Sequence, residues 1–220
     1  MKKLLYITAN SKPEHLSTSK TVGREFVNRF LEKNPDYGLE ELNLYSEHIP
    51  EVNHRIFTRR GEPVSGEQYN SLSREDKKEV DKINQLCDQF LRADVYVIAA
   101  PMWSISFPSI LKRYVDCIVI KDRTIKISQE EVVGLLGDKE RNMAYIQSSG
   151  GVYPKLLNWK INHGVDYFHD LFKFLGVDKF EKILVQGTDD EDVGIENAKV
   201  KAYSEVDDVI EKFSREPMFV

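Results

Sequence analysis

The sequence has few of the features that mark several large classes of protein. Its 220 residues contain two cysteines, Cys87 and Cys117, too few for a disulfide framework or a cysteine-rich zinc site. Both cysteines fall at core-like positions of segments with helical periodicity, which favours free thiols in a reducing compartment. We therefore expect a cytoplasmic protein without a metal centre.

Positive charge and long apolar runs are also scarce. Lys and Arg number 31 against 36 Asp and Glu, a formal net charge of −5, whereas nucleic acids and anionic membranes bind clustered cations. The opening MKKLLYITAN has a basic pair, but its apolar run is too short for a signal peptide or a membrane span. Neither nucleic acid nor membrane is an expected partner, and a small-molecule ligand remains open.

Several nucleotide-binding and hydrolase motifs are missing as well. The chain contains neither GxGxxG nor GxxxxGK[ST], so a dinucleotide or ATP site is disfavoured. It has no GxSxG elbow for a serine nucleophile. The five histidines show no HExxH or other metal-ligand spacing. The ends of the first and third predicted strands also lack the clustered acids of a signalling receiver domain.

What the sequence does contain is an alternation of short β-rich runs with longer stretches of helical period, which predicts βαβ units in a single domain over 1–220. Right-handed crossovers between such strands give an α/β, flavodoxin-like three-layer sandwich with a five-stranded parallel sheet in the order 2-1-3-4-5. In that order the loops after strands one, three and four share one crevice. The predicted strands are Leu4–Thr8, Leu39–Tyr45, Val95–Ala100, Met143–Ser148 and Lys182–Gln186.

The loop after the first strand is rich in hydroxyl groups. Ser17, Thr18 and Ser19 lie where the free N–H groups of a helix start could join side-chain hydroxyls around a single phosphate. The alternative is that Ser17 or Ser19 only caps the helix. The two interpretations are compatible.

The loop after the third strand, Pro101-Met102-Trp103-Ser104-Ile105, places a tryptophan between an apolar strand and an amphipathic helix. A flat aromatic ligand lying against Met102 and Trp103 would cover apolar area that otherwise has no covering. Alternatively, Trp103 packs under a neighbouring loop or against a partner chain.

The loop after the fourth strand reads Ser148-Ser149-Gly150-Gly151-Val152-Tyr153. A glycine pair directly after a strand permits either the close approach of a ligand to the backbone or a turn with positive φ. Sequence alone does not separate these two alternatives.

These segments together resemble the FMN-dependent NAD(P)H:quinone oxidoreductases, which include bacterial azoreductases. The resemblance is carried by Ser17-x-Ser19, by APMW followed by PSILKRYVD over 100–116, by GLL and SSGGVY over 134–153, and by LFKFLGV over 171–177. Trp103-Ser104 stands where the family often has Tyr-Asn, and Ser149-Gly150-Gly151 where it has Arg-Gly-Gly. The first loop is also one residue longer than in the family.

The resemblance implies a homodimer with one bound FMN per subunit that takes hydride from NADH or NADPH and reduces quinones, azo compounds or nitroaromatics by a ping-pong mechanism. The ribityl phosphate would be bound by Asn10, Ser11, Ser17, Thr18 and Ser19. The ring would be bordered by Pro101, Met102, Trp103, Ser104 and Ile105, with its pyrimidine edge at Ser148, Ser149, Gly150 and Gly151. Tyr153 and His163 are similar to a catalytic Tyr/His pair beside the flavin in animal quinone reductases.

Two points stay open at this stage. Residues 46–71 are expected to form an ordered excursion over the site or the dimer partner, where Phe57 could cover the flavin, or else a solvated loop. The alternative function is a flavodoxin-type electron carrier without its own NAD(P)H-dependent catalysis, since a fold does not determine a function.

Overall fold

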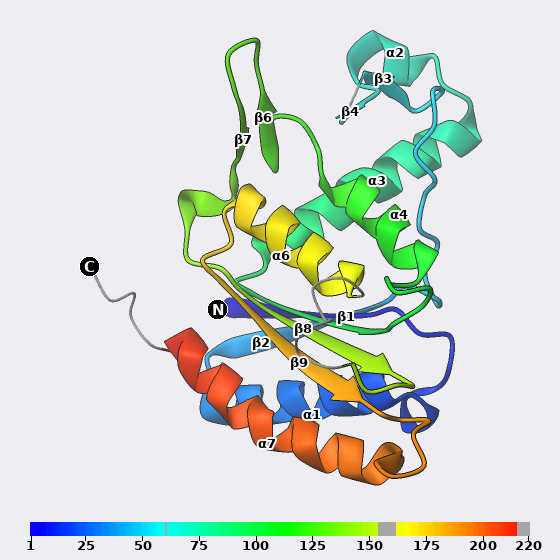
Figure 1. Ribbon diagram of the computed structural model, residues 1–220. Helices are drawn as coiled ribbons and strands as arrows, with labels where there is room; N and C mark the ends of the chain where they lie inside the picture. The colour runs from blue at the N-terminus through cyan, green and yellow to red at the C-terminus, as the bar shows by residue number, and fades with distance from the viewer. Residues whose placement is uncertain (60, 154–161, 215–220) are drawn as a thin grey trace.

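A five-stranded parallel sheet forms the centre of the protein in the computed structural model, which describes residues 1–59, 61–153 and 162–214 (Figure 1). Its strands are β1 (Lys2–Thr8), β2 (Tyr37–Asn43), β5 (Val95–Pro101), β8 (Asn142–Ser149) and β9 (Lys179–Gln186). They overlap the five segments predicted from the sequence, with β2 two residues earlier and β9 three residues longer at its start, and every neighbouring pair runs parallel.

The predicted strand order 2-1-3-4-5 needs correction, because the chain forms four further strands outside this sheet. β3 (Phe57–Arg59) pairs with β4 (Glu62–Pro63), and β6 (Ile125–Ile127) pairs with β7 (Val132–Gly134), both antiparallel. In chain numbering the sheet is therefore β2-β1-β5-β8-β9. Each added strand has only two or three residues, too few to show an alternating pattern.

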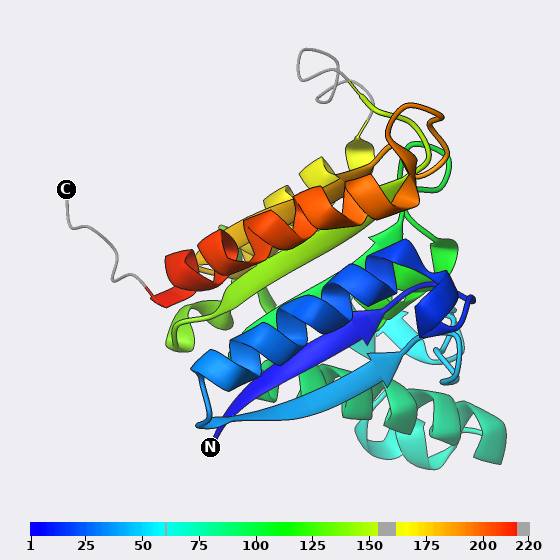
Figure 2. The same ribbon diagram turned by 90° about the horizontal axis from the view of Figure 1, so that it is seen from below.

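Helices cover both faces of the sheet, as the three layers in Figure 2 show. On one face lie α1 (Thr18–Lys33) and α7 (Gly194–Ser214), and on the other α3 (Arg74–Arg92), α4 (Ser109–Ile118) and α6 (His163–Leu175). The described elements also include the short helix α2 (Gly66–Asn70) and the 3-10 turns η1 (Glu14–Leu16) and η2 (Leu136–Asp138). In this part of the chain no helix is long and apolar enough to cross a membrane.

The sheet buries its middle strand on both faces. From Val95 to Ala100, no residue of β5 is more than 1% exposed, as expected for a parallel strand covered by two helical layers. Phe26 and Phe30 of α1 pack on one face of the sheet, and Phe168 and Phe172 of α6 pack on the other. This burial fixes the sheet firmly, so the loops at its edge start from rigid positions.

The helix boundaries follow local chemistry that the sequence shows. Ser73 caps α3 by accepting the N–H of Asp76 at 3.0 Å, and Gly176 ends α6 in the left-handed region with a φ of 105°. The last helix, α7, begins at Gly194 and not closer to the end of β9. The reason is that Asp190 Oδ1 accepts the N–H groups of Asp192 and Val193, which forms a separate turn before the helix.

Residues 46–59 and 61–71 pack on the α3–α4 layer. Ile49, Ile56 and Val64 are no more than 7% exposed, so this part is not a solvated loop. Phe57 lines a groove of about 980 Å³ beside α4, α6 and the β6–β7 hairpin. Phe57 therefore does not lie beside the loops that follow β1, β5 and β8 of its own chain.

Candidate functional site

The carboxyl ends of β1, β5 and β8 lie side by side at one edge of the sheet. The N–H of Ala9, just after β1, donates to Ala99 O in β5 at 2.9 Å. The N–H of Met102, just after β5, donates to Ser148 O in β8 at 2.7 Å. The three predicted loops therefore begin at adjacent points of the same edge.

In the first of these loops, hydrogen bonds converge on the Ser17 hydroxyl. Ser17 Oγ accepts Asn10 Nδ2 at 2.9 Å and the N–H of Lys20 at 3.4 Å, and lies 3.4 Å from Ser19 Oγ. Because the oxygen already accepts two hydrogen bonds, Ser17 enters the Ser19 contact as the donor, and a ligand can replace Ser19 as the acceptor of its hydrogen. A phosphate offers only acceptors at neutral pH, so this hydroxyl has the polarity that a phosphate requires.

Ser17 is also the N-cap of α1, as the alternative interpretation holds. Ser17 is 2% exposed, Ser19 and Asn10 are buried as well, and Ser11 is exposed. Thr18 is half-buried and contributes to the wall of a cavity of about 740 Å³. The hydroxyl cluster is thus largely covered, with Thr18 facing open space beside it.

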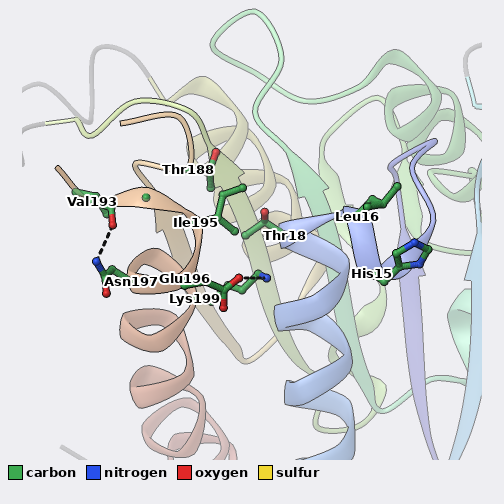
Figure 3. A pocket seen from close by; sticks show the side chains of 10 residues that line it. His15, Leu16, Thr18, Thr188, Val193, Ile195, Glu196, Asn197 and Lys199 are labelled. Atoms are coloured by element: carbon green, nitrogen blue, oxygen red, sulfur yellow. Dashed lines mark hydrogen bonds and ion pairs between the residues drawn. The ribbon is translucent and has the colours of Figure 1, made fainter. Parts of the chain in front are cut away.

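That cavity lies between the starts of α1 and α7 (Figure 3). Thr18, Thr188 and Ile195 approach it from three different segments, and His15 and Leu16 come from η1. The cavity therefore joins the loop after β1 to the loop after β9.

The loop after β5 forms a tight turn from Trp103 to Ser106. The N–H of Trp103 donates to Ser106 O at 3.3 Å, and the N–H of Ser106 donates to Trp103 O at 2.9 Å. Ser104 and Ile105 have φ values of 49° and 57°, the left-handed geometry that a type I′ turn requires. Such turns ordinarily use Asn or Gly, so a β-branched residue here is strained by about 1–3 kcal/mol.

This strained turn holds two apolar side chains in solvent. Trp103 is 46% exposed and Ile105 is 47% exposed, while Pro101 and Met102 are half-buried at its base. Within the described ranges, Trp103 is not packed under a neighbouring loop. The predicted aromatic platform is therefore open on one side.

Replacing Ile105 by asparagine is expected to stabilise the ligand-free protein by about 1 kcal/mol, because asparagine tolerates positive φ. Urea denaturation measures the free energy of unfolding of both proteins. Ile195, 45% exposed on α7, provides the matched control, and Ile195→Asn should bring no such gain. Equal effects of the two substitutions would show that the turn at Ile105 stores no strain.

Elements beneath the turn hold it in place. Gln147 Nε2 donates to Ser106 O at 3.3 Å, and the N–H of His163 donates to Ile105 O at 3.1 Å. A Cβ on Gly164 would lie 2.9 Å from Gln147 Nε2, so the start of α6 approaches this support closely. The turn is therefore fixed from both β8 and α6.

The third loop uses the first glycine of its pair for close approach within the chain. Neither Gly150 nor Gly151 has a positive φ. A Cβ on Gly150 would instead lie 2.4 Å from Asp189 Oδ2, and the N–H of Asp189 donates to Gly150 O at 3.0 Å. Ser148 and Ser149 are buried where β8 ends, and Gly151 is exposed. Gly150 therefore accommodates the loop after β9, whereas a Cβ on Gly151 would meet only the Tyr153 ring, at 3.8 Å.

The structure describes both residues of the predicted catalytic pair, Tyr153 and His163, but not residues 154–161 between them. Tyr153 is half-buried after the glycines, and His163 is the exposed first residue of α6. The catalytic role of the two side chains stays a prediction.

The two cysteines lie away from these loops, in α3 and α4. Cys87 and Cys117 are free and buried, and burial raises the pKa of Cys87 to about 11 and that of Cys117 to about 12. Neither is a thiolate at neutral pH. The described residues contain no group of three or more His, Cys, Asp or Glu side chains that could hold a metal ion.

Sequence reasoning missed Lys20. It lies in the first turn of α1 and is 5% exposed, although lysine is rarely buried without a partner. Its ammonium donates to Lys12 O at 2.8 Å, within the same loop that carries Asn10 and Ser17. A lysine near a helix start is ordinary in sequence, and only the folded loop reveals its burial.

The sheet order and the helical layers define the class, a flavodoxin-like α/β protein with three loops gathered at one carboxyl edge. A family model described as flavodoxin-like fold matches residues 2–208. An FMN-dependent NADH:quinone oxidoreductase 1 of Clostridium acetobutylicum is 58% identical over 212 residues, covering 96% of each chain. An FMN-dependent NADH:quinone oxidoreductase of Clostridium botulinum is 51% identical over 212 residues, which cover 96% of this chain and 99% of that protein.

Solved structures give the same result. An FMN-dependent NADH-azoreductase of Bacillus anthracis, solved in complex with FMN, superposes with a TM-score of 0.84 and 29% identity, covering 97% of this chain and all of that one. The chain belongs to the family of FMN-dependent NADH:quinone oxidoreductases and azoreductases, which confirms the family predicted from its loops.

Proposed function

We propose that the protein binds FMN at the carboxyl edge of its sheet and acts as an NADH-dependent oxidoreductase on quinones, azo compounds or nitroaromatics. The observation that carries the proposal is the meeting of a hydroxyl cluster, an exposed aromatic turn and a glycine pair at one edge. The relatives described above are named for FMN and NADH, which supports this cofactor and this reductant.

The residues of the edge fit an FMN. Ser17 has a hydroxyl hydrogen that a ligand can accept in place of Ser19, and the first N–H groups of α1 have no acceptor within the helix. The positive end of the helix dipole favours an anion there. We assign the phosphate to Asn10, Ser11, Ser17, Thr18 and Ser19, the ring to residues 101–105, and its pyrimidine edge to residues 148–151.

When bound, FMN supplies the chemistry of accepting a hydride and passing two electrons to a second substrate. The chain's own residues bind and orient. Backbone donors near Gly150 and Gly151 stabilise negative charge on the ring, and the exposed faces of Trp103 and Ile105 receive flat, apolar acceptors. Because NADH and the acceptor would use the same space in turn, we expect ping-pong kinetics.

Tyr153 and His163 are proposed to line the same space, since both flank the edge formed by β8 and the start of α6. A second copy of the chain is proposed to cover its open side. Trp103, Ile105 and Val152 are 46%, 47% and 49% exposed, and three large apolar side chains at one rim favour a partner surface. The expected assembly is a homodimer.

Anaerobic stopped-flow mixing of the FMN-loaded protein with NADH tests the proposal. We expect the flavin absorbance to disappear within the turnover time and to return when a quinone is added. If NADH reduces the bound flavin only when a separate reductase is supplied, the protein is a flavodoxin-type carrier instead. A protein that binds no FMN at all would refute both functions.

A further inference from the structure

Lys20 closes a ring of hydrogen bonds around the loop after β1. Its backbone N–H donates to Ser17 Oγ at 3.4 Å, and Asn10 Nδ2 donates to the same oxygen at 2.9 Å. The N–H of Lys12 donates to Asn10 Oδ1 at 3.0 Å, and Lys20 Nζ donates to Lys12 O at 2.8 Å. A single residue therefore holds both ends of residues 10–20, which we call the phosphate loop.

The ammonium of Lys20 has no carboxylate partner in the part of the chain that the structure describes. The two nearby carboxylates, Glu14 and Glu41, are both taken by Arg24, at 3.2 and 2.6 Å. Burial lowers the pKa of Lys20, and the charge of Glu14 acts in the opposite direction. The loop thus contains a largely desolvated cation whose charge no ion pair balances.

Both features favour a dianion. A loop already held in one shape loses less conformational entropy when a ligand binds. A positive charge in partly buried surroundings attracts a phosphate more strongly than it would in water. Neither effect acts on a ligand without a phosphate.

We propose that Lys20 is a positioning residue that holds the phosphate loop in its binding shape and makes the site prefer FMN to riboflavin, which lacks the phosphate. This inference rests on the proposed function, because it requires a flavin at the carboxyl edge. It adds a determinant of selectivity outside the hydroxyl cluster.

Titrations of the apoprotein with FMN and with riboflavin, followed by flavin fluorescence, test the inference. Lys20→Met keeps the aliphatic stem and removes the ammonium, and we expect it to lower the affinity for FMN about tenfold or more while the affinity for riboflavin changes less than about twofold. Lys20→Arg should keep the preference for FMN, because a cavity of about 170 Å³ beside Lys20 has room for the larger head group.

Lys139 provides the matched control, because its ammonium donates to Arg92 O at 3.0 Å and Asp94 Oδ1 at 2.6 Å at the opposite edge of the sheet. Lys139→Met should leave both affinities unchanged. Circular dichroism checks the fold of each variant, and Lys20→Gln replaces Lys20→Met if the latter does not fold.

The outcomes separate the two proposals. If Lys20→Met loses affinity for FMN and riboflavin equally, or for neither, Lys20 does not determine selectivity and the inference is wrong while the proposed function stands. If the unmodified protein binds neither flavin, the proposed function fails and the inference fails with it.

Discussion

Replacing Ser17 by alanine is expected to lower the affinity for FMN by about 10- to 100-fold, since a hydrogen bond to a charged group contributes about 1.5–3 kcal/mol. The substitution removes the hydroxyl on which Asn10 and the N–H of Lys20 converge. It also removes the N-cap of α1, at a cost of about 1 kcal/mol in the free energy of unfolding. Fluorescence titration and urea denaturation measure the two effects separately.

Ser73 allows the two effects of Ser17→Ala to be distinguished. Its Oγ caps α3 by accepting the N–H of Asp76 and donating to Asp76 Oδ2, both at 3.0 Å, and it belongs to none of the three loops. Ser73→Ala should reduce stability by a similar amount and leave FMN affinity unchanged. If both variants lose FMN to the same extent, the loss reflects helix stability, and Ser17 does not contact the phosphate.

Replacing Trp103 by alanine is expected to weaken flavin binding, acceptor binding or both by about tenfold, because stacking on an aromatic side chain contributes about 1–3 kcal/mol. Trp103 is 46% exposed, so its removal creates no core cavity and should hardly change the free energy of unfolding. Unlike Ser17→Ala, this variant should lose riboflavin and FMN affinity alike. Flavin titration and the KM for a quinone are the measurements.

Phe174 matches Trp103 in exposure, at 46%, but lines the groove beside the β6–β7 hairpin. Phe174→Ala should therefore leave flavin affinity and the quinone KM unchanged. Unchanged flavin binding and turnover in Trp103→Ala would show that Trp103 contacts neither the flavin nor the acceptor.

The meeting of the three loops could be predicted because parallel topology constrains it. Once β1, β5 and β8 are recognised as neighbouring parallel strands, their following loops must meet at one edge. Capping of α3 by Ser73 and the end of α6 at Gly176 depend only on residues close in sequence, so they too follow from local pattern.

Other features depend on contacts that local pattern does not show. Ser104 and Ile105 have positive φ values although neither is the glycine or asparagine that usually indicates such a turn. Hydrogen bonds from Gln147 and from the start of α6 hold the turn in this conformation. Gly150 is required by Asp189, which is 39 positions later in the chain. The β3–β4 and β6–β7 pairs are too short for their periodicity to be recognised.

Lys20 illustrates the same limit within a single loop. Ser17, Asn10 and Lys12 are all within ten positions of it, yet their hydrogen bonds form only when the loop folds back over the start of α1. Sequence reasoning identified the hydroxyl groups because hydroxyls at a helix start have a known chemistry. It gave no signal for a buried cation beside them.

Backbone amide NMR of the apoprotein titrated with FMN tests most directly whether one ligand contacts all three loops. We expect chemical-shift changes concentrated in residues 10–20, 101–106 and 148–153, with little change at the amino ends of the strands near Asp94 and Lys139. Changes confined to one loop, or centred on the opposite edge, would contradict a flavin site formed by the ends of β1, β5 and β8.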